Sequence, residues 1–102
     1  MNINTVIEDY LLEQGVKPGH KGFTYLTSVI NKCIENPKAL NSMTSLYKGI
    51  AKEFNSTVSR VERAIRYSRT SDMRNKDYIA MCTLMIKRRI AEIKKAPSVT
   101  AE

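Results

Sequence analysis

The spacing of the apolar residues constrains the fold of this chain more than any other feature of the sequence. Apolar side chains recur at intervals of three and four residues along most of the chain, which places them on one face of an α-helix. The strict alternation of apolar and polar residues that is typical of a half-buried strand does not occur. The sequence therefore predicts an all-α fold, a compact bundle of about five or six helices.

Polar segments that contain glycine, proline or asparagine divide this pattern into helices. The predicted helical segments are 3–14, 23–35, a short helix from Pro37, about 45–54, 57–69 and 78–95. Gly15 is expected to close the first helix in the left-handed conformation. Pro37 is expected at the first position of the third helix, and Thr44 or Ser45 is expected to cap the fourth.

Length and cysteine content limit the class of protein. A chain of 102 residues has room for one domain, predicted to occupy residues 1–95, followed by a disordered tail at 96–102. No uncharged run approaches the roughly 20 residues that span a bilayer, and no secretory signal is recognisable, so we expect a cytoplasmic protein. Cys33 and Cys82 fall within apolar helical patterns and are expected to be buried free thiols.

Catalytic and cofactor-binding patterns are not recognisable in the sequence. The single histidine, His20, has no serine, cysteine or carboxylate partner at a suggestive spacing, and the acidic residues are scattered. Gly19 and Gly22 lack the preceding strand and the Gly-Lys-Ser/Thr ending of a phosphate-binding loop. We therefore expect neither an enzyme activity nor a bound cofactor or metal.

The distribution of charge suggests a polyanionic partner. The formal net charge is +7, yet the first sixteen residues contain Glu8, Asp9 and Glu13 and no cation. The excess of Lys and Arg therefore lies in the middle and at the end of the chain, as in a protein with one basic face. Charge alone is equally compatible with an ordinary solvated surface.

Residues 45–69 have the features of a helix-turn-helix. Ala51 is small enough for the crossing of two helices, and Asn55 tolerates the positive φ that the turn requires. Thr57 or Ser56 can accept a hydrogen bond from the free amides of the second helix. The apolar side chains that would hold this second helix against the first are Val58, Val61 and Ile65.

The exposed side of the predicted recognition helix, 57–69, is polar and mainly cationic. A rotation of about 100° per residue places Ser59, Arg63 and Arg66 outward when Val61 is buried, with Arg60 and Glu62 on the two flanks. Arginine can donate two hydrogen bonds to guanine, and a carboxylate can accept one from the cytosine amino group. Arg60, Glu62 and Arg63 are thus the predicted base-reading residues. The alternative is that Glu62 only pairs with Arg66 one turn later.

Further polar residues around this helix are expected to contact the DNA backbone. They are Ser59, Arg66, Lys21, Lys52, Thr57 and His20. His20 lies next to Lys21 before the second helix, where free amides and cations could hold a phosphate. The alternative is a turn that only caps that helix.

Three blocks of the sequence resemble a known family. The blocks are Lys21–Leu26 (KGFTYL), Ile50–Asn55 (IAKEFN) and Ser59–Arg66 (SRVERAIR), of which the last is the most specific. They are similar to the C-terminal DNA-binding effector domain of the sporulation initiation response regulator, stage zero sporulation protein A, over most of the chain from Gly15 onward. The resemblance implies a bacterial transcriptional regulator that reads a short box similar to TGTCGAA in double-stranded DNA. It also matches Arg60, Glu62 and Arg63 to the base-reading positions.

Two features differ from the family pattern. In the family a phosphorylated receiver domain precedes this domain and controls dimerisation, so the chain is expected to be an isolated effector domain or a natural relative without that switch. The family also has a longer segment, with a tryptophan, after the recognition helix, which is associated with contact to the polymerase sigma subunit. Here the segment from Arg69 to Asn75 is shorter and the chain contains no Trp. A homodimer on DNA is expected, whereas the resemblance does not extend to the sigma contact.

A second hypothesis comes from a different functional class. A small helical protein of this kind could bind a protein, for example as a mobile-element product that antagonises a host regulator, through its acidic first helix or its last helix. Such a binder has no need to keep Arg60, Glu62 and Arg63 together on one helix. The sequence therefore favours DNA binding.

Overall fold

A computed structural model describes the backbone of residues 2–100 and the side chains of residues 2–95. These residues form the α-helices α1 (Ile3–Glu13), α2 (Lys21–Glu35), α3 (Met43–Glu53), α4 (Val58–Ser68) and α5 (Asn75–Thr100), with a 3-10 helix, η1 (Pro37–Asn41), between α2 and α3. No strand occurs in the described range. The all-α prediction is confirmed.

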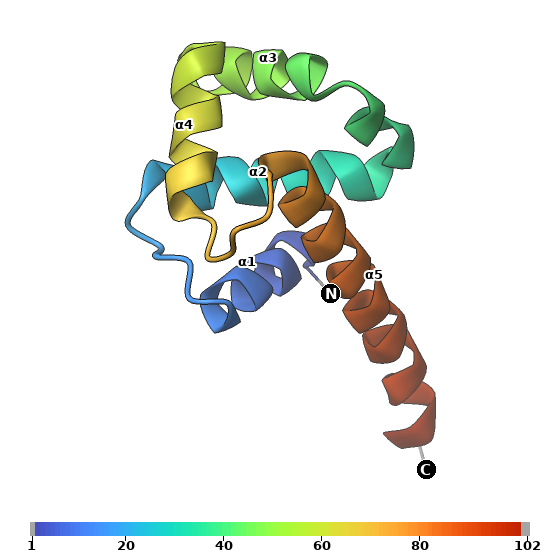
Figure 1. Ribbon diagram of the computed structural model, residues 1–102. Helices are drawn as coiled ribbons and strands as arrows, with labels where there is room; N and C mark the ends of the chain where they lie inside the picture. Colours follow the sequence, from blue (N-terminus) through green and yellow to red (C-terminus); the bar gives the residue numbers. More distant parts are fainter. Residues whose placement is uncertain (1, 101–102) are drawn as a thin grey trace.

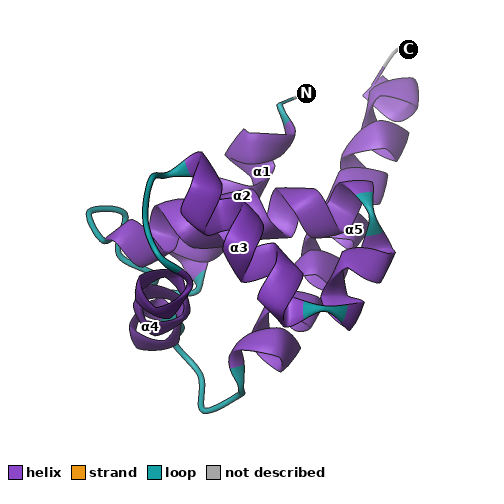
Figure 2. Cartoon of the chain, turned by 90° about the horizontal axis from the view of Figure 1, so that it is seen from above, coloured by secondary structure: helices purple, strands orange, loops and turns teal. Residues whose placement is uncertain are grey.

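Helix α2 is the centre of the arrangement, because every other helix packs against it. In Figure 1, α3 lies above α2, α1 lies below it, and α4 crosses one end. Helix α5 begins beside α2 and then leaves the body of the molecule, which Figure 2 shows from above. The molecule is therefore elongated, with extents of 51 × 26 × 25 Å.

The predicted apolar stripes meet in one core around α2. Its fully buried members include Ile7 and Leu11 of α1, Leu26 and Ile30 of α2, Ile50 of α3, Val61 and Ile65 of α4, and Ile79, Cys82 and Ile86 of α5. Three residues that the periodicity places in the apolar stripes are at the surface instead, among them Ile93, which is 38% exposed near the end of the described side chains of α5. Ile3 is 36% exposed in the first turn of α1, and Met85 is 40% exposed on a flank of α5 that the described helices leave uncovered.

The ends of the helices follow local rules that the sequence predicted in most cases. Gly15 has a φ of +89°, and the Val16 N–H donates to the Leu11 carbonyl at 3.0 Å, which is the expected left-handed helix end. Pro37 begins its helix as predicted, but that helix is of the 3-10 type.

The predicted cap of α3 at Thr44 or Ser45 is wrong. Ser42 caps α3, and its side chain accepts a hydrogen bond from the Ser45 N–H at 3.3 Å. The reason is that η1 ends at Asn41 and leaves Ser42 extended, so its hydroxyl is available two or three residues earlier than the sequence indicated.

The last helix extends beyond the predicted end at Lys95. The backbone of α5 is helical to Thr100, whereas the side chains of residues 96–100 and all of residues 101–102 lie outside the described part of the chain. The predicted disorder of residues 96–102 therefore stays a prediction. Among the described helices, none is both long enough and apolar enough to cross a bilayer.

Candidate nucleic-acid interface

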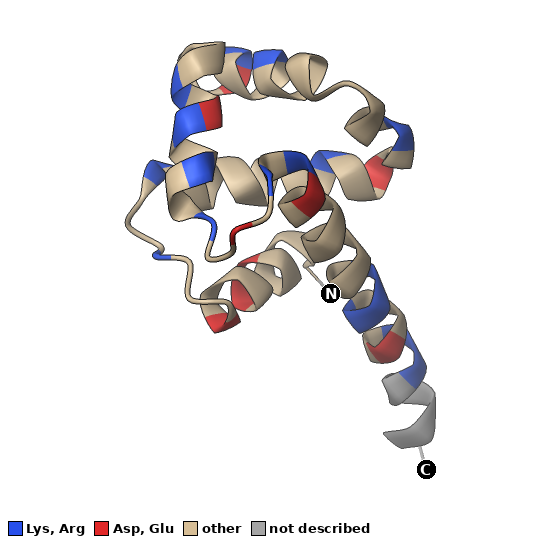
Figure 3. Ribbon diagram, in the orientation of Figure 1, with Lys and Arg blue, Asp and Glu red and all other residues tan. Residues whose placement is uncertain are grey.

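Helix α4 lies at the edge of the molecule with one narrow face in the core. Val61 and Ile65 are fully buried, whereas Val58 and Ala64 on either side are half-buried. Most of the remaining surface of α4 is exposed. Figure 3, in which Lys and Arg are blue, shows such residues both on this helix and in the segment before α2. The fold therefore presents α4 as a basic helix held by a thin apolar stripe.

The turn before α4 fixes where this helix starts. Asn55 has a φ of 54°, which confirms the predicted left-handed turn residue. The Ser56 N–H donates to the carbonyl of the buried Ala51 at 2.7 Å, and the Thr57 hydroxyl accepts a hydrogen bond from the Arg60 N–H at 3.2 Å. The local features predicted for a helix-turn-helix in α3, the turn and α4 are thus present.

Close packing of backbones fixes α4 from a second side. A Cβ atom built on Gly22 of α2 would lie 1.9 Å from the Ser68 Oγ and 2.4 Å from the Ala64 carbonyl oxygen. Only a residue without a side chain lets the first turn of α2 approach α4 this closely. The sequence indicated a turn at Gly22 and gave no signal of this contact. One consequence is that the neighbouring Lys21 lies beside α4.

Three predicted DNA-binding side chains meet in a hollow of about 320 Å³ between α2 and α4. Lys21 at the start of α2 faces Arg60 and Arg63 of α4 across it. The other lining residues are Tyr25, Phe54, Asn55, Ser56, Ala64 and Tyr67. We call this surface the α2–α4 hollow. Because its lining contains three cations and no acidic residue, it is suited to an anionic group.

The carboxylate among the predicted base-reading residues lies on the other flank of α4. Glu62 accepts hydrogen bonds from the Arg66 Nε at 3.1 Å and from its terminal nitrogen at 3.3 Å. The side chains of Arg66 and Glu62 are 44% and 37% exposed, so this ion pair contributes little to stability. The pairing that the sequence offered as the alternative for Glu62 is therefore present in the free protein.

The other residues that are predicted to contact the DNA backbone lie at several different places in the structure. His20 is the cap residue of α2 but makes no side-chain capping hydrogen bond, and its side chain is exposed beside Lys21. Ser59 is exposed on the outer face of α4. The Thr57 hydroxyl serves as the helix cap. Lys52 is exposed in the last turn of α3 and does not line the α2–α4 hollow.

Tyr67 is a residue of this surface that the sequence reasoning missed. It is 74% exposed, it lines the α2–α4 hollow, and the Arg66 guanidinium lies 5.3 Å from the centre of its ring. The helical period contained the signal, because Tyr67 follows Arg63 by four residues and therefore lies on the same face of α4.

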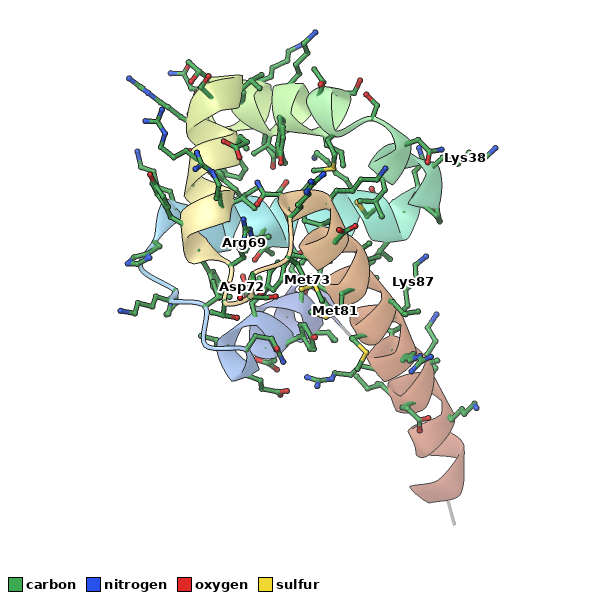
Figure 4. All side chains as sticks on the ribbon, in the orientation of Figure 1. Lys38, Arg69, Asp72, Met73, Met81 and Lys87 are labelled. Carbon is green, nitrogen blue, oxygen red and sulfur yellow. The ribbon has the colours of Figure 1, made fainter. Side chains whose placement is uncertain are left out.

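A buried asparagine holds the far end of α4. The side-chain amide of Asn75 donates to the Tyr47 hydroxyl at 3.0 Å and to the Glu62 carbonyl at 3.2 Å. Its side-chain oxygen accepts a hydrogen bond from Arg69 Nε at 2.8 Å, and Arg69 also donates to the Ser71 carbonyl at 2.7 Å. Figure 4 shows Arg69 between the end of α4 and the start of α5. The segment after α4 is thus tied to both helices.

The two cysteines are part of the core. Both are fully buried free thiols, as predicted. Burial raises the pKa of Cys82 to about 11 and also raises the pKa of Cys33, so the reactive thiolate is scarce at neutral pH. Within the described residues, no group of three or more His, Cys, Asp or Glu side chains is arranged to hold a metal ion.

A comparison with protein families identifies the kind of chain that carries this surface. Residues 7–100 match the family model described as "Sporulation initiation factor Spo0A C terminal". The matched range contains α2, α3 and α4 in full, and with them every residue assigned above to the basic surface of α4.

Proposed function

We propose how this chain, which belongs to the Spo0A C-terminal family, recognises DNA. The family is the DNA-binding effector domain of a sporulation response regulator and is not an enzyme. The chain is therefore a DNA-binding transcriptional regulator. In our proposal α4 enters the major groove of double-stranded DNA, at the bacterial chromosome, and reads a short box similar to TGTCGAA.

The proposal rests on one observation: the fold holds the basic helix α4 in place and leaves its cationic side exposed. An α-helix with its side chains is about 10–12 Å wide, which fits a major groove about 12 Å wide. Arg60 and Arg63 project from the exposed side of α4, and neither guanidinium is engaged in an ion pair within the described residues. Each is thus available to donate two hydrogen bonds to a guanine.

Glu62 is proposed to accept a hydrogen bond from a cytosine amino group. In the free protein its carboxylate is held by Arg66, which keeps it extended along the surface of α4. Because this pair is exposed, its exchange costs only a few tenths of a kcal/mol. Arg66 can then turn to a phosphate while Glu62 turns to the base.

The phosphate backbone on one side of the groove is proposed to lie in and around the α2–α4 hollow. Lys21 supplies a cation there, and the exposed His20 lies beside it. Ser59 and Thr57 in the first turn of α4, together with Lys52 at the end of α3, are proposed as further backbone contacts. Such contacts position the protein without reading sequence.

Two copies on adjacent sites are proposed for tight binding, because a single recognition helix contacts only a few base pairs. A contact with the polymerase sigma subunit is not part of the proposal. The segment that joins α4 to α5 is short, and Arg69 in this segment and Asn75 at the start of α5 are committed to hydrogen bonds within the protein.

The test compares Arg63→Ala with Lys38→Ala on two labelled duplexes, one with the TGTCGAA-like box and one scrambled. Lys38 lies in η1, at the opposite end of the molecule from α4 (Figure 4). We expect Arg63→Ala to cost about 1–3 kcal/mol on the box and much less on the scrambled duplex, and Lys38→Ala to change neither. Equal losses on both duplexes would refute base reading by Arg63.

A further inference from the structure

The flank of α4 that faces away from the α2–α4 hollow has a second concave basic surface. It is a hollow of about 340 Å³ between α3, α4 and the start of α5. Its lining residues are Met43, Tyr47, Glu62, Arg66, Arg69, Arg74, Asn75 and Lys76. We call it the α4–α5 hollow. Helix α4 is thus bordered by cations on both sides.

The four cations of the α4–α5 hollow differ in their availability. Arg69 is held by Asn75 and by the Ser71 carbonyl, and Arg66 is paired with Glu62, the one acidic residue of the lining. Arg74 and Lys76 are exposed. Neither of these two side chains has an ion pair or a hydrogen bond within the described part of the chain. Two cations are therefore available on this flank.

We propose that Arg74 and Lys76 bind the DNA phosphate backbone on the side of α4 opposite to Lys21. This inference rests on the proposed function and extends it. A helix in the major groove lies between two phosphate strands, so cations on one flank can hold only one edge of the groove. Cations on both flanks fix the depth and the tilt of α4.

The position of these two residues relative to α4 is fixed by the residue between them. Asn75 is buried and donates to the Glu62 carbonyl of α4 and to the Tyr47 hydroxyl of α3. The backbone at Arg74 and Lys76 therefore cannot move away from α4 without breaking these hydrogen bonds. Their long side chains stay free to reach a phosphate, as contacts of this kind require.

The nearby acidic residues do not cancel this charge. Asp77 is exposed in the first turn of α5 and Asp72 is exposed in the preceding segment, but neither lines the α4–α5 hollow. The carboxylate of Glu62 does line it, and Arg66 compensates its charge. The positive charges of Arg74 and Lys76 are therefore not neutralised within the hollow and can attract a phosphate.

The experiment neutralises both cations in the full chain. Arg74→Gln/Lys76→Gln is compared with Lys38→Gln/Lys87→Gln, which removes the same charge at residues that lie away from α4 in Figure 4. A charge-preserving variant, Arg74→Lys/Lys76→Arg, separates charge from packing. Affinity for the box and for a scrambled duplex is measured by anisotropy at several salt concentrations, and the circular dichroism melt of each variant reports folding.

We expect Arg74→Gln/Lys76→Gln to weaken binding to both duplexes alike, by about tenfold at low salt, and to reduce the slope of log K against log salt by about 1.8 relative to the control pair. The charge-preserving variant is expected to keep the wild-type slope. A slope equal to that of the control pair overturns the inference, as does a loss confined to the box. Wild-type protein that binds neither duplex refutes the proposed function itself, which distinguishes the two failures.

Discussion

Replacement of Gly22 by alanine is the sharpest test of how α4 is held. The added methyl group would lie 1.9 Å from the Ser68 Oγ, 2.5 Å from the Ser68 Cβ and 2.4 Å from the Ala64 carbonyl oxygen. Ser68 is buried, so its side chain has little room to turn away. The Ala64 oxygen belongs to the backbone of α4 and can move only with the helix. The first turn of α2 and α4 must therefore separate by about 1 Å to restore van der Waals contact.

The expected cost follows from two opposing effects. Overpacking of a well-packed contact costs about 1–3 kcal/mol, and a clash with backbone belongs at the upper end of that range. Alanine is about 1 kcal/mol better than glycine in a helix interior; since Gly22 is the second residue of α2, less than this amount offsets the cost. We expect Gly22→Ala to lower the free energy of unfolding by about 2 kcal/mol, which corresponds to a fall in Tm of about 10 °C for a domain of this size.

The measurement is urea unfolding followed by circular dichroism at 222 nm. Gly19→Ala is the matched control, because nothing lies within 4 Å of a Cβ at Gly19, and its effect should stay within about 0.5 kcal/mol. Gly22→Ala/Ser68→Ala should recover only part of the loss, since the contact with the Ala64 oxygen remains. Equal stability of Gly22→Ala and Gly19→Ala would refute the argument that a backbone contact holds α4 against α2.

Two further predictions concern the polar contacts. Asn75→Ala should cost about 2–3 kcal/mol in urea unfolding, because it removes the partner of the buried Tyr47 hydroxyl and of the half-buried Arg69 Nε, and a hydrogen bond to the Glu62 carbonyl; an unchanged midpoint would contradict the role of this residue. Hydrogen bonds from Arg89 and from Ser28 hold the pKa values of Glu13 and Glu53 below the usual 4.5, so their stabilisation is complete above about pH 4.5 and is lost as pH falls through the lower folded-state values. The fall in stability between about pH 5 and pH 3 should be smaller in Glu13→Gln/Glu53→Gln, and an identical pH profile would contradict this.

The helices and several of their ends could be predicted from the sequence because short-range rules determine them. An apolar stripe with a helical period is stable when it is buried against another element. The residues that end helices act through their own backbone conformation and the next few amides. Gly15 and Asn55 at positive φ and Thr57 at the start of α4 are therefore predictable without any knowledge of the fold.

The features that position α4 depend on contacts between distant parts of the chain and could not be predicted in this way. Gly22 has the same local sequence signal as a turn glycine, and its role appears only when α2 meets α4. Asn75 looks like an ordinary polar residue before a helix, yet it links α3, α4 and α5. Conversely, Met85 continues the apolar pattern of α5 but is exposed because no described helix covers it.

In the candidate site, too, some features follow from the local sequence and others arise only from the fold. The orientation of Arg60, Glu62 and Arg63 follows from the helical period once Val61 is buried. The presence of Lys21 beside Arg60 and Arg63 does not, because it requires the close approach of α2 at Gly22. Arg74 and Lys76 of the α4–α5 hollow are likewise separated from α4 by a loop and become its neighbours only in the fold.

These contacts imply that little of the energy of DNA binding is spent on ordering the protein. The apolar stripe, the packing at Gly22 and the hydrogen bonds of Asn75 hold α4 from three directions before DNA is present. What remains to be ordered is the exposed arginine and lysine side chains, at about 0.5–1.5 kcal/mol each. A substitution that loosens the contacts around α4, such as Gly22→Ala, should therefore weaken binding to the box, even though Gly22 has no side chain that could contact DNA. A matched affinity for wild type and Gly22→Ala, measured at a temperature where both are folded, would show that α4 is instead positioned by the DNA.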